Sequence, residues 1–319
     1  MSSTPRVLVL AGGLSHERDV SLRSGRRVSE ALREAGCETF ERDVDPHLVA
    51  DLRQGVVDVV WPLLHGASGE DGAVRDVLDL LGIPYVGSGP AACRTAWDKP
   101  VAKSVALAAG LATPASVALP HGTFRELGAQ AVLGAMVERL GLPLVIKPAR
   151  GGSALGVTVV RKASELPRAM VGCFAYGDVA LVERFVEGVE VAVSIVDTGD
   201  GPRALPAVEI VADGGVYDYD ARYVAGSTEF FVPARLTEPA RAAVEDAALR
   251  AHRAFGLRHL SRTDLIVDRT GRPWFLEVNV APGMTETSLL PQSAEAAQED
   301  CGVLYRRLVE AAATGARTS

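Results

Sequence analysis

The sequence has few aromatic residues, few cysteines and no long apolar run. Aromatic residues make up 5% of the chain, so the core must consist mainly of Ala, Val and Leu. No segment approaches the ~18 consecutive apolar residues that a membrane-spanning helix needs. The apolar run at residues 7–11 is too short for a secretion signal. The four cysteines are far apart and match neither a zinc motif nor a small disulfide framework, which predicts isolated buried thiols in a reducing cytoplasm: Cys37, Cys93, Cys173 and Cys301.

An excess of basic charge is also missing. The 33 Lys and Arg residues are outnumbered by 40 Asp and Glu residues, which gives a net charge of −7. This balance argues against a partner such as nucleic acid or a membrane surface. The 48% hydrophobic and 23% charged content is typical of globular proteins. At roughly 150 residues per domain, 319 residues predict about two domains or one large α/β unit.

The first part of the chain alternates between strand-like and helix-like segments. Residues 6–10 form an apolar run that ends in glycines, and apolar residues at helical spacing follow until Gly36. A second apolar strand at 57–64 precedes a helix at about 70–81 and a short strand at 84–86. This alternation predicts an open α/β domain with a largely parallel sheet over residues 1–87.

From about residue 98 the pattern changes. A helix of small residues at 99–111 is followed by two strands, 142–147 and 157–160, that predict an antiparallel hairpin around a glycine-rich loop. Two more strands are expected within 179–196, then a long loop at 212–231, a helix at 239–255, a hairpin at 260–280 and a helical tail from 293. We expect further domains at 88–182 and 183–319.

The hairpin at 260–280 carries the strongest chemical pattern. Side chains alternate faces along a strand, so Arg262 and Asp264 share a face, as do Glu277 and Asn279. A turn around residue 271 places Asp264 opposite Glu277, and the same alternation directs four apolar side chains toward the core: Leu265, Val267, Leu276 and Val278. Two carboxylates and an amide are ligands that Mg²⁺ accepts. The alternative is a solvated polar face.

Other segments fit the binding of a phosphate or another ligand. The loop at 150–156 contains three glycines and follows Lys147, as a backbone that approaches a phosphate would; an ordinary hairpin turn is the alternative. His65 follows a strand at the edge where ligands bind in α/β sheets. Arg222 and Tyr223 lie in the long loop and could close over a ligand. Helix capping is the simpler interpretation of three acidic residues: Glu17, Glu70 and Asp71.

Familiar nucleotide and nucleophile motifs are absent. Residues 87–92 loosely fit a dinucleotide fingerprint, but no acidic residue follows between positions 99 and 125 to bind a ribose. The chain has neither a GxxxxGK[ST] phosphate loop nor a Gly-x-Ser-x-Gly elbow. If ATP binds, it binds to another architecture.

Together, the motifs resemble the D-alanine–D-alanine ligase family of the ATP-grasp superfamily over residues 6–313. The matching segments, in order, are 15–21 (SHERDVS), 65–72 (HGASGEDG), 98–99 (DK), 147–153 (KPARGGS), 182–185 (VERF), 217–223 (YDYDARY), 262–264 (RTD), 277–285 (EVNVAPGMT) and 288–289 (SL). The resemblance implies an N-terminal α/β domain followed by a two-lobed ATP-grasp unit. It also implies a cytoplasmic homodimer that acts in peptidoglycan precursor synthesis.

The resemblance further implies the chemistry and its residues. ATP would phosphorylate the carboxylate of one D-alanine, and the amine of a second would displace the phosphate. Two Mg²⁺ ions, or Mn²⁺ as a substitute, would be held by Asp264, Glu277 and Asn279. The nucleotide would bind Lys99, Lys147, Glu183, Glu190 and Arg222. The reaction would use Glu17, Ser153, Tyr223, Arg262 and the N–H of Gly283, and the substrates would contact His65, Ser288 and Leu289.

The sequence departs from the family pattern at a few positions. Ala154 replaces a second serine and Arg222 replaces a lysine. Val280 and Ala281 replace a threonine-containing run, and Asp19 replaces a glutamate. Two alternatives therefore stay open: a ligase of the same mechanism with a different second substrate, and a nucleotide-binding protein without catalysis. Tyr223 favours the dipeptide, because related ligases that make D-alanyl-D-lactate typically have histidine there.

Overall fold

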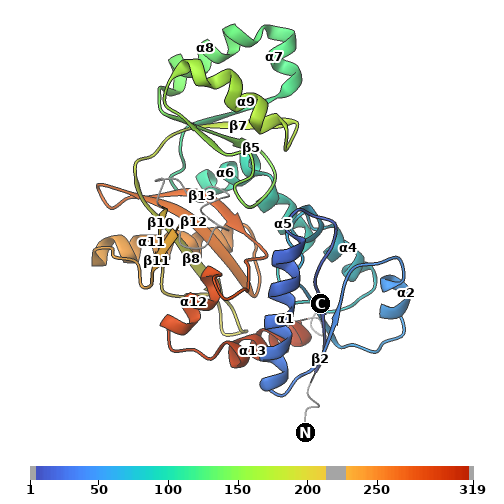
Figure 1. Cartoon of the computed structure of the whole chain (residues 1–319). Helices are drawn as coiled ribbons and strands as arrows, with labels where there is room; N and C mark the ends of the chain where they lie inside the picture. Colours follow the sequence, from blue (N-terminus) through green and yellow to red (C-terminus); the bar gives the residue numbers. More distant parts are fainter. Residues whose placement is uncertain (1–4, 213–227, 316–319) are drawn as a thin grey trace.

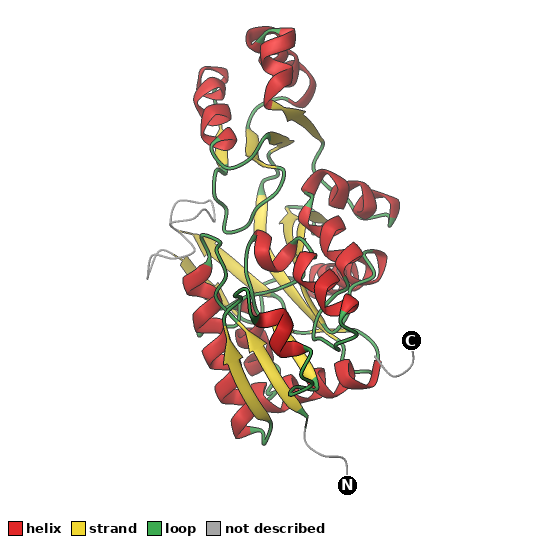
Figure 2. Cartoon of the chain, turned by 90° about the vertical axis from the view of Figure 1, so that its right-hand side faces the viewer, coloured by secondary structure: helices red, strands yellow, loops and turns green. Residues whose placement is uncertain are grey.

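The structure is a computed structural model, and it describes residues 5–212 and 228–315. Figure 1 shows three lobes, each built on its own sheet. The N-terminal lobe lies beside the C-terminal lobe, and the middle lobe stands above both; the view in Figure 2 separates the middle lobe most clearly. The α/β class and the two-lobed unit after a parallel-sheet domain are confirmed.

The N-terminal lobe has a parallel sheet in the order β2-β1-β3. Its elements are β1 (Arg6–Leu10), α1 (Arg18–Glu34), β2 (Glu38–Arg42), α2 (Leu48–Leu52), β3 (Val59–Pro62), α3 (Ala67–Glu70) and α4 (Ala73–Leu80). The predicted strand at 84–86 is reduced to one parallel bridge between Tyr85 and Val60. The sequence pattern did not reveal β2, because three of its five side chains are exposed and none is buried.

The middle lobe has an antiparallel sheet in the order β4-β7-β5-β6. Two helices, α5 (Pro90–Trp97) and α6 (Lys99–Ala108), lead into it, followed by β4 (Ser116–Pro120), α7 (His121–Leu127), α8 (Ala129–Leu140), β5 (Leu144–Pro148), β6 (Thr158–Val160), η1 (Ala163–Glu165), α9 (Leu166–Phe174) and β7 (Val179–Arg184). The predicted antiparallel hairpin is confirmed by the pairing of Leu144 with Val160. Its loop contains the glycine-rich segment.

The C-terminal lobe has a larger antiparallel sheet in the order β11-β10-β8-β12-β13, with β9 paired to β8. Its elements are β8 (Gly188–Val196), β9 (Arg203–Ala204), β10 (Val208–Ala212), β11 (Thr228–Phe231), α11 (Glu238–Ala254), β12 (Leu260–Asp268), β13 (Pro273–Asn279), α12 (Leu289–Ala296) and α13 (Cys301–Gly315). The expectation of a loop over 212–231 was wrong at its end, because β11 pairs with β10. The segment 213–227 lies outside the described residues.

The hairpin β12–β13 contains a bulge that the simple alternation of side chains missed. Asp264 does pair with Glu277, as predicted, but the next residue, Leu265, pairs with Phe275. The extra residue is Leu276, and it lines a cavity beside Glu277 instead of entering the core. Phe275 takes its place in the core, 1% exposed and stacked on Phe255. The prediction that Leu276 points toward the core was wrong, because a bulge changes the alternation locally.

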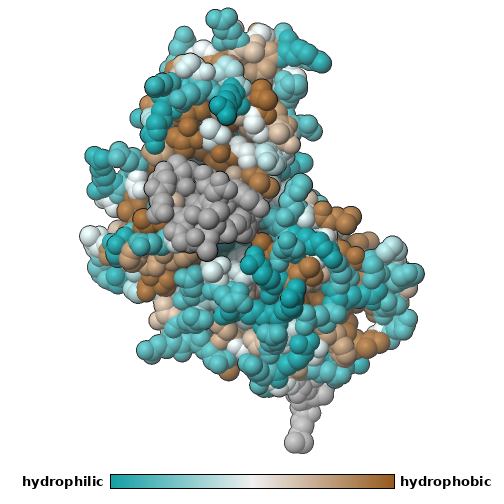
Figure 3. All heavy atoms as spheres, in the orientation of Figure 1, coloured by the Kyte–Doolittle hydropathy of each residue, from teal (hydrophilic) through white to brown (hydrophobic). Residues whose placement is uncertain are grey.

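The end of the chain returns to the first lobe. Helix α13 packs against α1 and β3, and the Tyr305 ring meets the Trp61 ring edge-on with their centroids 5.4 Å apart. A single apolar cluster therefore joins the N-terminal lobe to α12 through Leu290 and to the loop before α12 through Met284. In Figure 3 hydrophobic side chains also show on the part of the middle lobe nearest the other two.

The cysteines are free thiols. Cys37, Cys93 and Cys173 are buried as predicted, and Cys301 is half-buried. No helix among the described residues is long and apolar enough to cross a bilayer.

Candidate active site

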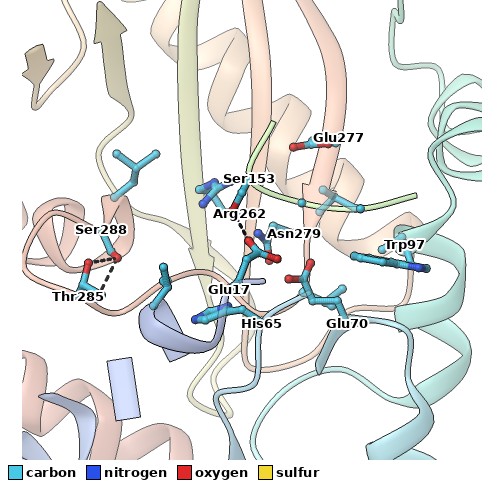
Figure 4. A pocket seen from close by; sticks show the side chains of 18 of the residues that line it. Glu17, His65, Glu70, Trp97, Ser153, Arg262, Glu277, Asn279, Thr285 and Ser288 are labelled. Carbon is cyan, nitrogen blue, oxygen red and sulfur yellow. Dashed lines mark hydrogen bonds between the residues drawn. The ribbon is translucent and has the colours of Figure 1, made fainter. Parts of the chain in front are cut away.

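Two cavities meet between the three lobes. One, called here the nucleotide cavity, lies between the sheets of the middle and C-terminal lobes and is lined by residues such as Val145, Phe185 and Ile266. The other, the substrate cavity, is lined by all three lobes and contains Glu17, His65 and Ser288 (Figure 4). Both are lined by the same four residues at their junction: Lys99, Gly151, Gly152 and Glu277. A group could therefore pass from one cavity to the other at this junction.

A buried group of three charges forms part of the wall of the nucleotide cavity. The Glu183 carboxylate, 2% exposed, accepts hydrogen bonds from Lys103 and from Lys147, whose Nζ lies 2.6 Å from Oε2. Lys103 also donates to Thr113 Oγ1 at 2.6 Å. Lys147 comes from β5 and Glu183 from β7, which are adjacent strands, and Lys103 lies one helical turn after Lys99 on α6.

These three groups set one another's pKa values. Burial alone would raise the pKa of Glu183, but the two lysines outweigh it and hold that pKa below its usual range. Burial would lower the pKa of Lys147, but Glu183 and more distant carboxylates raise it. Burial does lower the pKa of Lys103. The arrangement keeps a fixed cation, Lys147, facing the nucleotide cavity.

The glycine-rich loop is tied to Lys99 at the junction of the cavities. Lys99 Nζ donates to the Gly151 carbonyl at 2.6 Å, and the Lys99 backbone N–H donates to the Ala149 carbonyl at 2.9 Å. Ser153 and Ala154 have positive φ angles of 52° and 55°, as a loop that turns its amides inward requires. The loop thus combines a neighbouring lysine with left-handed backbone, a conformation in which successive N–H groups can bind a phosphate.

The predicted metal ligands lie at this junction. Asp264 and Glu277 are directly paired across β12–β13 and both line the nucleotide cavity. In this structure each carboxylate faces a cation of the chain, because Arg262 grips Asp264 through two hydrogen bonds of 2.7 and 2.8 Å and Lys99 lies 3.4 Å from Glu277. Asn279 lines the substrate cavity, and its Oδ1 accepts from the Ala281 N–H at 2.8 Å.

This donor set fits Mg²⁺ in kind. It consists of oxygen atoms only, with two carboxylates side by side. Among residues 5–212 and 228–315 no three His, Cys, Asp or Glu side chains cluster as metal ligands. The predicted third donor, Asn279, is an amide and lies beside Glu277 at the wall of the substrate cavity. The remaining positions of an octahedron would go to phosphate oxygens or water, as is usual for Mg²⁺.

Glu17 and Ser153 meet across the substrate cavity, although 136 residues separate them. The Ser153 hydroxyl donates a short hydrogen bond to Glu17 Oε1, drawn as a dashed line in Figure 4. Two glycines allow this approach. A Cβ on Gly66 would lie 2.9 Å from Glu17 Oε2, and one on Gly152 would lie 3.1 Å from the same carboxylate. Glu17 precedes α1 as its N-cap residue, but its side chain makes no capping hydrogen bond and is directed instead to Ser153.

His65 lies at the bottom of the substrate cavity, 4% exposed, at the predicted end of β3. Its Nε2 lies 3.4 Å from Ser24 Oγ, and it also hydrogen-bonds the Ala281 backbone. Burial lowers the pKa of His65 to about 4, so the ring is neutral near pH 7. Neutral His65 can keep one donor and one acceptor in fixed directions.

Ser288, Leu289 and Gly283 line the far end of the same cavity. Ser288 Oγ accepts from the Thr285 N–H at 2.9 Å and lies 2.9 Å from Thr285 Oγ1. A Cβ on Gly283 would lie 2.8 Å from Ser288 Oγ, so this close approach requires glycine. The loop 280–288 therefore brings hydroxyl and amide groups together opposite Glu17.

Glu70 is a buried carboxyl that the sequence suggested only as a capping residue. It lines the substrate cavity at 8% exposure and accepts from the Gly66 N–H at 2.9 Å. Burial, with Glu17 nearby, raises the pKa of Glu70 to about 8. Its position four residues after Gly66, on one helical turn, was the available sequence signal.

Glu70→Gln is expected to change how stability depends on pH. In the wild type the folded state keeps the Glu70 proton between pH 4.5 and 8 while the unfolded state loses it, so stability falls as pH rises through this window. The upper limit is about 1.4 kcal/mol per pH unit. Glutamine does not titrate and can still accept from Gly66. Urea unfolding at pH 5, 6.5 and 8 should show the free energy of unfolding of the variant rising relative to that of the wild type as the pH increases. A difference that does not depend on pH would contradict the raised pKa of Glu70.

Other residues complete the comparison with the sequence. Glu190 is half-buried in the nucleotide cavity, next to Ile210 and Ile266 on neighbouring strands. Arg222 and Tyr223 lie outside the described residues. Sequence reasoning missed Lys103 and the pair Arg235–Glu209, in which the Arg235 guanidinium donates to the carboxylate at 2.6 and 3.0 Å beside the nucleotide cavity. Their partners are distant in sequence, so no local motif marks them.

Two antiparallel sheets that enclose one cavity, with lysines and paired carboxylates facing it, define a nucleotide-binding enzyme of the ATP-grasp class. Comparisons with known proteins agree. The family profile described as "D-ala D-ala ligase C-terminus" matches residues 105–312, and "D-ala D-ala ligase N-terminus" matches residues 41–88. The chain belongs to the D-alanine–D-alanine ligase family.

Individual relatives cover nearly the whole chain. A D-alanine–D-alanine ligase of Bordetella petrii is 43% identical over 291 residues, which is 91% of this chain and 87% of the relative. The structure of the Bacillus anthracis D-alanine–D-alanine ligase complexed with ATP has a TM-score of 0.80 at 28% identity and 99% coverage of both chains. The VanG D-Ala:D-Ser ligase from Enterococcus faecalis has a TM-score of 0.84 at 26% identity, covering 97% of this chain and all of that one.

Proposed function

We propose that this chain joins two D-alanine molecules to D-alanyl-D-alanine, with cleavage of ATP to ADP and phosphate through an acyl phosphate, for peptidoglycan precursor synthesis. The observation that carries the proposal is the meeting of the two cavities at Lys99 and Glu277 in a chain of this family. An oxygen atom of a substrate carboxylate in one cavity can there reach the terminal phosphate of a nucleotide in the other.

In the first step, a carboxylate oxygen of the first D-alanine attacks the γ-phosphorus, and the bond to the ADP oxygen breaks. Lys99 and Lys147 supply fixed positive charge for the phosphates, with Arg222 from the long loop as a further cation. Glu183 and Glu190 hold the adenine and ribose region. When bound, Mg²⁺ neutralises phosphate charge and orients the oxygens. Asp264, Glu277 and Asn279 are the residues that would hold it.

In the second step, the amine of the second D-alanine attacks the acyl-phosphate carbon, and the C–O bond to phosphate breaks. Glu17 holds the ammonium of the first substrate and, with Ser153 and Tyr223, forms a network that assists proton removal from the attacking amine. Arg262 and the N–H of Gly283 stabilise the oxyanion. His65 lies near the carboxylate of the first substrate, and Ser288 and Leu289 hold the carboxylate of the second.

The domain boundaries, the number of ions, the use of Mn²⁺, a cytoplasmic location and a homodimer stay predictions. Ala154 and Arg222 leave open a different second substrate with the same mechanism. The Enterococcus faecalis structure belongs to a D-Ala:D-Ser ligase, so choice of the second substrate varies on this fold.

The test is phosphate release from Mg²⁺·ATP against a panel of D- and L-amino acids, with products identified by mass. We expect release to depend on D-alanine and to yield D-alanyl-D-alanine. A mixed product with D-serine or another partner would replace the proposed substrate pair. ATP binding without turnover for any pair would contradict catalysis.

A further inference from the structure

Three successive backbone N–H groups in the loop before α12, those of residues 283–285, differ in their hydrogen-bond acceptors. The Met284 N–H donates to Ser24 Oγ at 3.1 Å, and the Thr285 N–H donates to Ser288 Oγ at 2.9 Å. Within the described part of the chain, the Gly283 N–H donates to no protein acceptor, and Gly283 lines the substrate cavity. The hydroxyls of Ser24 and Ser288 thus accept from the next two amides, and the Gly283 amide at the cavity wall has no acceptor among the described residues.

Ser24 is held firmly enough to fix this loop. It lies in α1 and is completely buried. The next residue, Gly25, brings α1 so close to the residue after β1 that a Cβ there would lie 2.4 Å from the Cβ of Ala11. The helix therefore cannot shift toward the sheet, and Ser24 Oγ is a fixed acceptor.

His65 contacts the same loop on the N-terminal side of Gly283. The ring bonds the Ala281 backbone, and its Nε2 lies 3.4 Å from the same Ser24 hydroxyl. Because Ser24 Oγ already accepts from Met284, its own proton is available for Nε2. Ala281, His65, Ser24 and Met284 then form one chain of contacts that spans the loop containing Gly283. Met284 is also packed in the core, where Tyr305 Oη lies 3.7 Å from its sulfur.

We infer that Ser24 is a positioning residue for the oxyanion-binding amide of Gly283. This rests on the proposed function, in which that amide stabilises the tetrahedral intermediate of the second step. The first step, attack of a carboxylate on phosphorus, forms no oxyanion at carbon. Loss of the Ser24 hydroxyl should therefore slow ligation selectively, because a hydrogen-bond donor that shifts by a fraction of an ångström loses much of its effect.

The test compares Ser24→Ala with Ser29→Ala. Ser29 lies in the same helix, is equally buried, and its hydroxyl has no hydrogen-bond partner among the described residues. Acyl-phosphate formation is measured by the exchange of ¹⁸O in ATP from the β–γ bridge to the non-bridging positions of the β-phosphate. Ligation is measured by dipeptide formation. We expect Ser24→Ala to lower dipeptide formation by about 10- to 100-fold while isotope exchange stays near the wild-type rate. Ser29→Ala should leave both rates unchanged.

An unchanged ratio of exchange to ligation in Ser24→Ala would overturn the inference, whether both rates stay normal or fall together. If Ser24→Ala does not fold, Ser24→Cys replaces it, because a thiol is small but a weak acceptor; an unchanged ratio there overturns the inference equally. Wild-type enzyme that makes no dipeptide would instead refute the proposed function.

Discussion

We expect Asp264→Asn to lower both phosphate release from ATP and dipeptide formation by at least about a thousandfold while the protein still folds. Asparagine has nearly the same shape, so the hairpin β12–β13 keeps its pairing. What changes is the charge: one of the two paired carboxylates that face the nucleotide cavity becomes neutral. A hard divalent cation loses a charged ligand, and Arg262 loses the carboxylate that it now grips with two hydrogen bonds.

Asp268→Asn is the matched control on the same strand. Asp268 lies at the hairpin turn, where it accepts hydrogen bonds from Thr270 and from the Trp274 indole at 2.8 Å, and it lines neither of the two joined cavities. We expect this variant to lose some stability and keep its turnover. Phosphate release and thermal unfolding of both variants check the pair. Asp264→Asn with more than about a tenth of wild-type activity would remove Asp264 from the metal site.

Glu183→Gln has the second largest expected effect, on stability and on ATP binding together. The substitution leaves two buried ammonium groups, Lys103 and Lys147, without their shared carboxylate. Breaking a buried ion pair by removing one partner costs about 3–5 kcal/mol. The KM for ATP should rise by about tenfold or more, because Lys147 is no longer held toward the nucleotide.

Glu190→Gln is the control for this variant, because Glu190 lines the same cavity but is only half-buried. It should lower the free energy of unfolding much less. Urea unfolding distinguishes the two, since both residues line the nucleotide cavity and both variants can change the KM for ATP. If Glu183→Gln unfolds at the same urea concentration as Glu190→Gln, the ion pairs of Glu183 with Lys103 and Lys147 do not stabilise the fold as described.

The parts of the site that could be predicted from the sequence are those in which the contacting residues are close together along the chain. Strand alternation and a short turn suffice to pair Asp264 with Glu277, and the structure has that register. A lysine followed by a glycine-rich loop predicts a phosphate site on the same logic. The prediction for Leu276 failed because a bulge inserts a residue without a sequence signal as clear as a glycine or proline.

Contacts between distant segments could not be predicted from residues alone. The hydrogen bond from Ser153 to Glu17 joins two lobes, and Ser24 meets Met284 across 260 positions. In neither pair does the local sequence around one residue indicate which distant residue it contacts. Burial decides the state of Glu70 and His65, and burial depends on how the lobes pack. The resemblance to a family supplied roles for such residues that periodicity and spacing could not.

The most direct test of the central claim follows an oxygen atom. D-alanine with ¹⁸O in both carboxylate oxygens is incubated with Mg²⁺·ATP, and the phosphate and dipeptide are analysed by mass. If the carboxylate attacks the γ-phosphorus, one ¹⁸O passes to each phosphate released and one stays in the peptide carbonyl. Phosphate without ¹⁸O, formed together with dipeptide, would mean that the carboxylate never bonded to phosphorus and would contradict the account.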